Sequence, residues 1–276
     1  MPTDIESILK AADTAMRRRK LAKFQNPLHV GVDLGTAYTV VMVLDGHMKP
    51  LVGAYQFAQV VRDGVVVDFM GAIDLLKRLK TQVERKLGME LTSAASAYPP
   101  GVPVAEVQAV RYVLEGADLE CTQLIDEPTA ANALLGVKNG AVVDVGGGST
   151  GIAIIADGKV VYTADEPTGG THFTLVIAGD RGISFEEAET LKLDPKVQQD
   201  LAPTVRPVME KVATIIQRHL TGRDVRHITL VGGAAAFPGI AEVVADVTGI
   251  PTTVPSRPLF ITPIGIAMNH TGKSHV

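Results

Sequence analysis

The sequence has a single cysteine and no tryptophan, and aromatic residues make up only 4% of its 276 residues. One cysteine excludes an internal disulfide bond and any zinc site built from a cysteine cluster. Cys121 has no histidine near it in the sequence, so we expect a small, half-buried residue there rather than a nucleophile. With so few aromatics, the cores must be built mainly from valine, isoleucine, leucine and alanine, which favours an α/β fold over an aromatic-rich β-sandwich.

Long apolar runs and a strong net charge are also missing. No stretch of about 18 apolar residues occurs, so we expect no transmembrane segment. The N-terminus shows no hydrophobic signal segment, which favours the reducing cytoplasm as the place where the chain works. The net charge of −4 gives no reason to expect nucleic acid as a partner.

The segment 1–28 differs from the rest of the chain and predicts an amphipathic helical extension. Its apolar residues recur at helical spacing, at Ile5, Ile8, Leu9, Ala12, Ala15 and Met16. Three interpretations remain open: a helix docked on its own domain, a helix that binds a partner, or a helix at a membrane surface.

One pattern occurs twice, in residues 29–46 and 141–158. Each copy has an apolar strand that reaches an aspartate, Asp33 or Asp144, followed by a glycine turn with hydroxyl side chains. A second apolar strand and an Asp-Gly pair complete each copy. A single hairpin of this kind is a weak signal, whereas two copies in one chain indicate a repeated functional unit.

The chemistry of these turns points to phosphate and magnesium. Glycine lets backbone N–H groups approach phosphate oxygens, because no Cβ stands in the way. Thr36, Ser149 and Thr150 add hydroxyl donors. A carboxylate beside a phosphate would be repelled unless a cation lay between them, so Asp33 and Asp144 are predicted to hold a hydrated Mg²⁺.

These two hairpins resemble the phosphate-1 and phosphate-2 motifs of the actin/Hsp70/sugar-kinase superfamily. Residues 124–133 resemble its first connecting helix, 228–240 its adenosine motif and 261–268 its second connecting helix. The resemblance implies an α/β, actin-like (ribonuclease H-like) duplicated fold in which Mg-ATP lies in a cleft between two lobes. The lobes would comprise residues 29–139 with 259–276, and residues 140–258. Further helices are predicted near 71–88, 103–117, 184–192, 203–220 and 238–248.

Within the superfamily, four stretches are similar to the EutJ family of ethanolamine utilisation: 61–69, 97–101, 164–170 and 183–189. This resemblance implies a chaperone-like role. The expected protein partners are ethanolamine-degrading enzymes or the proteins of their bacterial microcompartment.

The superfamily resemblance also implies roles for individual residues. Asp33, Asp144 and Glu127 would serve catalysis, with Glu127 facing the attacking water or the water shell of the metal. The residues expected to contact the nucleotide are Gly35, Thr36, Ala37, Gly146, Gly147, Gly148, Ser149, Gly169, Gly170, Gly232, Gly233 and Phe237.

The sequence departs from Hsp70 in three ways. The stretch 63–69 offers no counterpart of the lysine that assists hydrolysis there, and Ala236 stands where Hsp70 has an arginine that stacks on adenine. Such a stack is worth about 0.5–2 kcal/mol. Few residues follow Met268, so we expect no peptide-binding domain and no client clamp of the Hsp70 kind. ATP binding with slow hydrolysis is therefore the main expectation.

Other functions fit the same fold. A catalytically idle actin-like scaffold agrees with the missing lysine and arginine. A filament-forming bacterial actin homologue is suggested by residues 63–69, which are similar to those of MreB. A small-molecule kinase ranks last, because no large inserted substrate loop is present.

Overall fold

The computed structural model describes residues 5–19, 21, 23–62 and 65–271, so Asp63 and Gly64 of the 61–69 stretch lie outside the described residues. The chain forms two compact units. Unit 1 holds the described residues up to Gly136 together with those from Phe260 onward, and unit 2 runs from Val137 to Leu259. None of the described helices combines the length and apolar content needed to cross a membrane.

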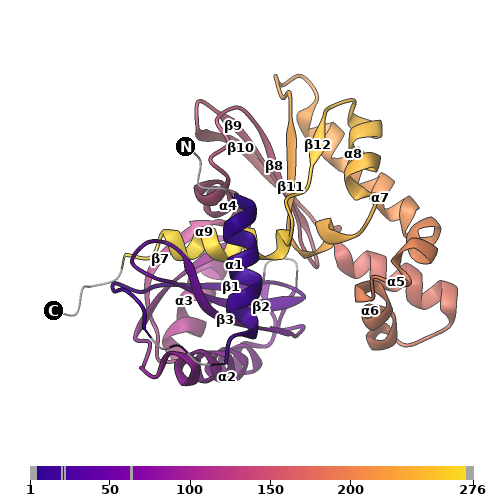
Figure 1. Ribbon diagram of the computed structural model, residues 1–276. Helices are drawn as coiled ribbons and strands as arrows, with labels where there is room; N and C mark the ends of the chain where they lie inside the picture. Colours follow the sequence, from indigo (N-terminus) through magenta and orange to yellow (C-terminus); the bar gives the residue numbers. More distant parts are fainter. Residues whose placement is uncertain (1–4, 20, 22, 63–64, 272–276) are drawn as a thin grey trace. The chain divides into compact units, whose positions relative to one another are not determined.

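Unit 1 is built on a five-stranded sheet with the order β3-β2-β1-β6-β7 (Figure 1). Its strands are β1 (His29–Leu34), β2 (Tyr38–Leu44), β3 (Pro50–Phe57), β6 (Ser93–Tyr98) and β7 (Glu120–Asp126), beside a small hairpin of β4 (Val61–Arg62) and β5 (Val65–Val66). Its helices are α1 (Ile5–Arg17), α2 (Phe69–Leu87), α3 (Val104–Gly116), α4 (Glu127–Leu135) and α9 (Ile261–Met268).

Helices cover both faces of this sheet. Helices α2 and α3 bury one face in a core that includes Val32, Val43 and Cys121. The opposite face is marked by a rung of paired residues, Gly31, Met42 and Gly53. Backbone atoms of α9 lie against Gly31, and the Met16 side chain of α1 lies against Gly53. Rung residues share a face, so α9 and α1 pack on the same side.

The N-terminal helix is therefore docked on its own unit, as the first of the three interpretations holds. Leu9, Ala12 and Ala15 are fully buried. Lys86 of α2 donates hydrogen bonds to the carbonyls of Met16 and Gly53, at 3.0 and 2.7 Å. The apolar stripe of α1 is thus accounted for by packing within unit 1.

Unit 2 repeats the architecture with the strand order β10-β9-β8-β11-β12. Its strands are β8 (Gly140–Val145), β9 (Thr150–Ala156), β10 (Lys159–Glu166), β11 (Ile228–Val231) and β12 (Thr252–Thr253). Its helices are α5 (Gly170–Arg181), α6 (Phe185–Leu193), α7 (Gln198–Leu220) and α8 (Ile240–Thr248), with a 3₁₀ turn η1 (Gly233–Ala236); a second one, η2 (Pro258–Phe260), leads back to unit 1.

Two helices of unit 2 differ from what the sequence predicts. Helix α7 begins at Gln198 rather than near 203, so Pro203 lies inside it. The extra turn buries Leu201 in the core, which offsets the hydrogen bond that proline cannot donate. Helix α5 was not predicted, because glycines and β-branched residues give it a weak helical signal. It is stabilised by burying Phe173 and Ile177.

The crossing of α4 and α9 in unit 1 depends on a glycine. A Cβ added at Gly265 would lie 1.8 Å from the carbonyl oxygen of Ala130 and 2.5 Å from its carbon. Backbone atoms cannot move aside as a flexible side chain can. The two connecting helices therefore approach at a distance that only glycine allows.

We expect Gly265→Ala to destabilise unit 1. Helix propensity alone would make alanine more stable than glycine by about 1 kcal/mol. The clash with the backbone of Ala130 should outweigh this gain. We expect the free energy of unfolding of the variant to be about 1–3 kcal/mol below that of the wild type, the usual effect of overpacking. Urea unfolding of the two proteins measures the difference, and a more stable variant would contradict the close crossing.

Candidate phosphate-binding turns and their surroundings

The two predicted phosphate turns have the same backbone geometry. In unit 1, strands β1 and β2 are paired up to Leu34 and Thr39, and Gly35 N donates to Tyr38 O at 3.1 Å. In unit 2, strands β8 and β9 are paired up to Val145 and Thr150, and Gly146 N donates to Ser149 O at 3.0 Å. Both turns therefore have four residues closed by one equivalent hydrogen bond. The sequence repeat is a structural repeat.

Each turn presents backbone N–H groups for an anion. In the part of the chain that the structure describes, no acceptor takes the N–H groups of Gly147, Gly148 and Ser149. The same holds for Thr36 and Ala37 in unit 1. Consecutive N–H groups of this kind form a concave site for phosphate oxygens. Their number favours the turn of unit 2 as the stronger anion site.

Two carbonyl groups of the unit 2 turn, unlike the N–H groups of residues 147–149, are hydrogen-bonded within the described part of the protein. Gly146 O and Gly147 O accept hydrogen bonds from Gly170 N and Thr171 N, at 2.8 and 2.7 Å. These donors belong to the first turn of α5, where backbone N–H groups lack intrahelical partners. The helix start is thereby fixed to the turn, and Gly169 and Gly170 lie beside it.

Gly169 allows this approach. A Cβ there would lie 2.6 Å from Gly146 O and 2.9 Å from Gly147 O. The Gly169 N–H is itself bonded, since it donates to Nδ1 of His172 at 3.3 Å. His172 thus caps the start of α5.

Asp144 lies at the centre of the unit 2 site. Its Oδ1 is 2.1 Å from where a Cβ of Gly232 would be, and Gly232 has a φ of +88°. Only glycine suits that backbone and leaves room for the carboxylate. The same oxygen is 3.9 Å from the missing Cβ of Gly146. The Asp144 carboxylate therefore lies near both the phosphate turn and the segment predicted for adenosine.

In unit 1, Asp33 and Glu127 lie at the same edge of the sheet. Strands β1, β6 and β7 run parallel, and Glu127 follows directly after β7. Oδ1 of Asp33 is 4.0 Å from the missing Cβ of Gly35, which matches Asp144 and Gly146 in unit 2. Asp126 caps α4 by accepting from Thr129 N at 3.0 Å, and this fixes Glu127 in the first helical turn.

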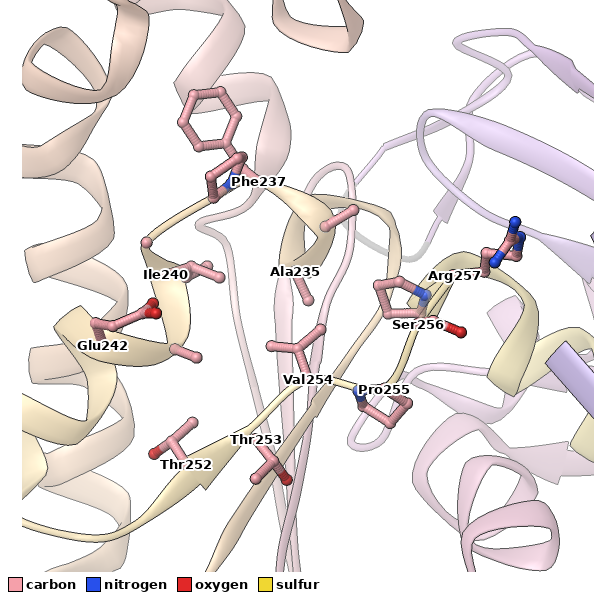
Figure 2. A pocket seen from close by; sticks show the side chains of 15 residues that line it. Ala235, Phe237, Ile240, Glu242, Thr252, Thr253, Val254, Pro255, Ser256 and Arg257 are labelled. Carbon is pink, nitrogen blue, oxygen red and sulfur yellow. The ribbon is translucent and has the colours of Figure 1, made fainter. Parts of the chain in front are cut away.

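A pocket of about 500 Å³ adjoins the adenosine segment of unit 2. Its walls are residues 235–242 on one side and 252–258 on the other, with the hydroxyls of Thr252 and Thr253 among apolar groups (Figure 2). The ring of Phe237 points away from Val254 and packs edge to face on Phe173, with centroids 5.9 Å apart. A contact between Phe237 and a base would therefore involve its backbone.

One charged group beside the turn was missed by sequence reasoning. Nζ of Lys192 donates to Gly170 O at 3.2 Å, to Thr174 Oγ1 at 2.8 Å and to Glu189 Oε2 at 2.6 Å. Burial lowers the pKa of Lys192 below its ordinary value, and the charge of Glu189 opposes that shift. The i, i+3 spacing of Glu189 and Lys192 indicates a pair, but nothing in the sequence reveals its burial.

The structure thus groups the predicted residues by unit. Unit 2 brings together Asp144, residues 146–149, Gly169, Gly170 and Gly232, whereas unit 1 holds residues 33–37 and Glu127. That one nucleotide contacts both sets stays a prediction. Among the described residues, no group of three or more histidine, cysteine or acidic side chains could hold a metal by itself.

Comparison with known proteins places this geometry in a family. The family model of the type IV pilus assembly protein PilM matches residues 136–262, and that of MreB/Mbl protein matches residues 52–180. The ethanolamine utilization protein EutJ of Salmonella typhimurium is 43% identical over 254 residues, which cover 92% of this chain and 89% of that protein.

Two solved structures are also similar to this chain. The crystal structure of EutJ from Carboxydothermus hydrogenoformans aligns with a TM-score of 0.92 and 44% identity, covering 97% of this chain and 98% of that one. MreB5 of Spiroplasma citri, solved with AMPPNP bound, aligns with a TM-score of 0.68 and 18% identity, covering 88% and 96%. The predicted actin-like α/β fold is confirmed.

We expect Gly169→Ala to destabilise unit 2, because its Cβ would push α5 away from the carbonyls of the turn. The cost should be about 1–3 kcal/mol. Gly179→Ala is the matched control, since Gly179 lies in the same helix with nothing within 4 Å of an added Cβ. Thermal and urea unfolding compare the two variants; equal effects would show that α5 does not need the close approach.

Proposed function

This chain belongs to the EutJ family of ethanolamine-utilisation proteins, and from that premise we propose that it binds Mg-ATP and acts as a chaperone-like factor in the cytoplasm. It would assist the assembly or reactivation of ethanolamine-degrading enzymes or of their microcompartment. The turn of residues 146–149 would hold the phosphates. The single observation that carries the proposal is the cradle of N–H groups at Gly147, Gly148 and Ser149.

Phosphate suits this cradle for two reasons. Backbone N–H groups donate at fixed positions, and the turn cannot rearrange freely because α5 is bonded to its carbonyls. The related MreB5 structure was solved with AMPPNP and with ADP, which supports a nucleotide as the phosphate ligand. The pocket beside residues 235–237 has the size of a small-molecule site and is our proposed place for the base.

Magnesium fits the residues present. Mg²⁺ keeps several waters and is held in nucleotide sites by one or two carboxylates plus phosphate oxygens. Asp144 supplies a carboxylate next to the turn, and Asp33 supplies one next to the turn of unit 1. The bound metal would neutralise phosphate charge; Asp144 would orient its water shell, and Glu127 would orient the attacking water.

Hydrolysis should be slow. Lys192, the buried lysine beside the turn, already donates to three oxygens of unit 2. Its charge is largely offset by Glu189, so it is a poor substitute for a free lysine at the γ-phosphate. We therefore propose turnover at or below ~1 s⁻¹, the low end of the usual range.

We expect Asp144→Ala to weaken Mg-ATP binding at least tenfold, because the carboxylate that anchors the water shell of the metal is lost. Calorimetry on nucleotide-stripped protein measures the affinity with Mg²⁺ and with EDTA. Asp246→Ala, an exposed aspartate of α8, is the control and should bind like the wild type. Equal affinity in wild type and Asp144→Ala would refute the proposed site.

For the partner, we expect the wild-type protein to retain an ethanolamine-degrading enzyme or a microcompartment protein from cells grown on ethanolamine. The amount retained should differ between ATP and ADP, and Asp144→Ala should remove that difference. Affinity capture with quantitative mass spectrometry measures both. Identical retention in both nucleotides would favour an idle scaffold, and ATP-dependent light scattering of the purified chain would favour a filament.

A further inference from the structure

A glycine separates two aspartates in the sheet of unit 2. Gly151 of β9 is paired with Asp144 of β8 on one side and with Asp165 of β10 on the other. The three residues form one rung across neighbouring strands. Side chains on a rung stand on the same face of a sheet, so the two carboxylates share a face, with about 10 Å between their Cα atoms.

The carboxylate of Asp165 reaches over the glycine, whereas that of Asp144 lies beside Gly232. A Cβ added at Gly151 would lie 3.6 Å from Oδ1 of Asp165 and 3.9 Å from Cβ of Asp144. No side chain therefore separates the two acidic residues on this rung. Oδ1 of Asp165 is itself a buried atom.

The neighbouring residue confirms which face Asp165 occupies. Glu166 turns toward α7, where its carboxylate is bonded to His219 at 2.8 Å and to Arg218. This pairing lowers the pKa of Glu166 below its ordinary value. Successive side chains of a strand alternate between faces, so Asp165 lies on the face opposite to α7. Asp144 lies on that face too, because its neighbours Val143 and Val145 are in the core with α7.

The end of β10 is also fixed to the phosphate turn. Thr150 Oγ1 donates to Thr168 O at 2.6 Å, and Gly170 N donates to Gly146 O. Asp165 is therefore held one rung away from Thr150, the residue that follows the turn. Its place is set by the pairing of β10 with β9 and by these two bonds beyond the end of the strand.

A hydrated Mg²⁺ in a nucleotide site is held by one or two carboxylates plus phosphate oxygens, and Asp144 and Asp165 offer two carboxylates on one face of the sheet. We propose that Asp165 is the second carboxylate of unit 2 for the Mg²⁺ that accompanies the nucleotide. It acts together with Asp144 across Gly151 by accepting hydrogen bonds from waters of the metal. The assignment rests on the proposed nucleotide binding and adds to it the residue that makes binding magnesium-dependent.

The test measures the Mg²⁺ dependence of ADP binding. The dissociation constant of ADP is determined by calorimetry in EDTA and in saturating Mg²⁺, and their ratio is the magnesium factor. Asp165→Asn should reduce this factor at least tenfold relative to the wild type. In EDTA the variant should bind ADP at least as tightly as the wild type, because a negative charge near the phosphates is gone.

Asp157→Asn is the matched control. It makes the same change at the opposite end of the β9–β10 hairpin, where Asp157 is exposed and has a φ of +51°, a conformation that asparagine tolerates. Its magnesium factor should equal that of the wild type. An unchanged factor in Asp165→Asn would overturn the assignment, even where its thermal stability falls.

A second variant covers the case in which Asp165→Asn does not fold. Gly151→Ala places a methyl group against Oδ1 of Asp165 and Cβ of Asp144 at ordinary contact distances, so it should fold and lower the magnesium factor. An unchanged factor there counts against the assignment. A wild-type protein that binds no ADP with or without Mg²⁺ would refute the proposed function itself, and the role of Asp165 with it.

Discussion

Two short hydrogen bonds, from Gly170 N and Thr171 N to the carbonyls of Gly146 and Gly147, hold the site of unit 2 together. They satisfy donors at the start of α5 and carbonyls of the turn at once. With the carbonyls engaged, the N–H groups of residues 147–149 are left for a ligand. The glycine at 169 follows from this constraint, because a side chain there would separate the helix from the turn.

Duplication has produced two turns with unequal support. Both close with the same hydrogen bond, and both place an aspartate carboxylate about equally far from the first glycine. In unit 1, however, the turn is held by Ala58 N, which donates to Ala37 O at 3.0 Å, and Ala58 follows a strand rather than beginning a helix. The same folding unit thus provides two candidate anion sites, and the turn of unit 2 is held by more hydrogen bonds than the turn of unit 1.

The turns could be predicted because their chemistry is local: glycines, hydroxyls and an aspartate within a few residues. The burial of Lys192 and the ring orientation of Phe237 could not, because both depend on which helices pack around them. Asp165 lies in the stretch 164–170, which resembles the EutJ family. Its place opposite Asp144 depends on strand register, which a bulge between Val160 and Tyr162 shifts and which sequence periodicity does not reveal.

The close crossing of Gly265 and Ala130 has a consequence for the order in which the chain folds during synthesis. Unit 2 is continuous in sequence and can fold once its own residues have left the ribosome. Unit 1 cannot be completed before α9 has been synthesised, because the backbone of α9 covers Gly31 of β1. Until residues 261–268 emerge, part of the first sheet made stays uncovered, so the earliest-made half of the molecule is the last to be completed.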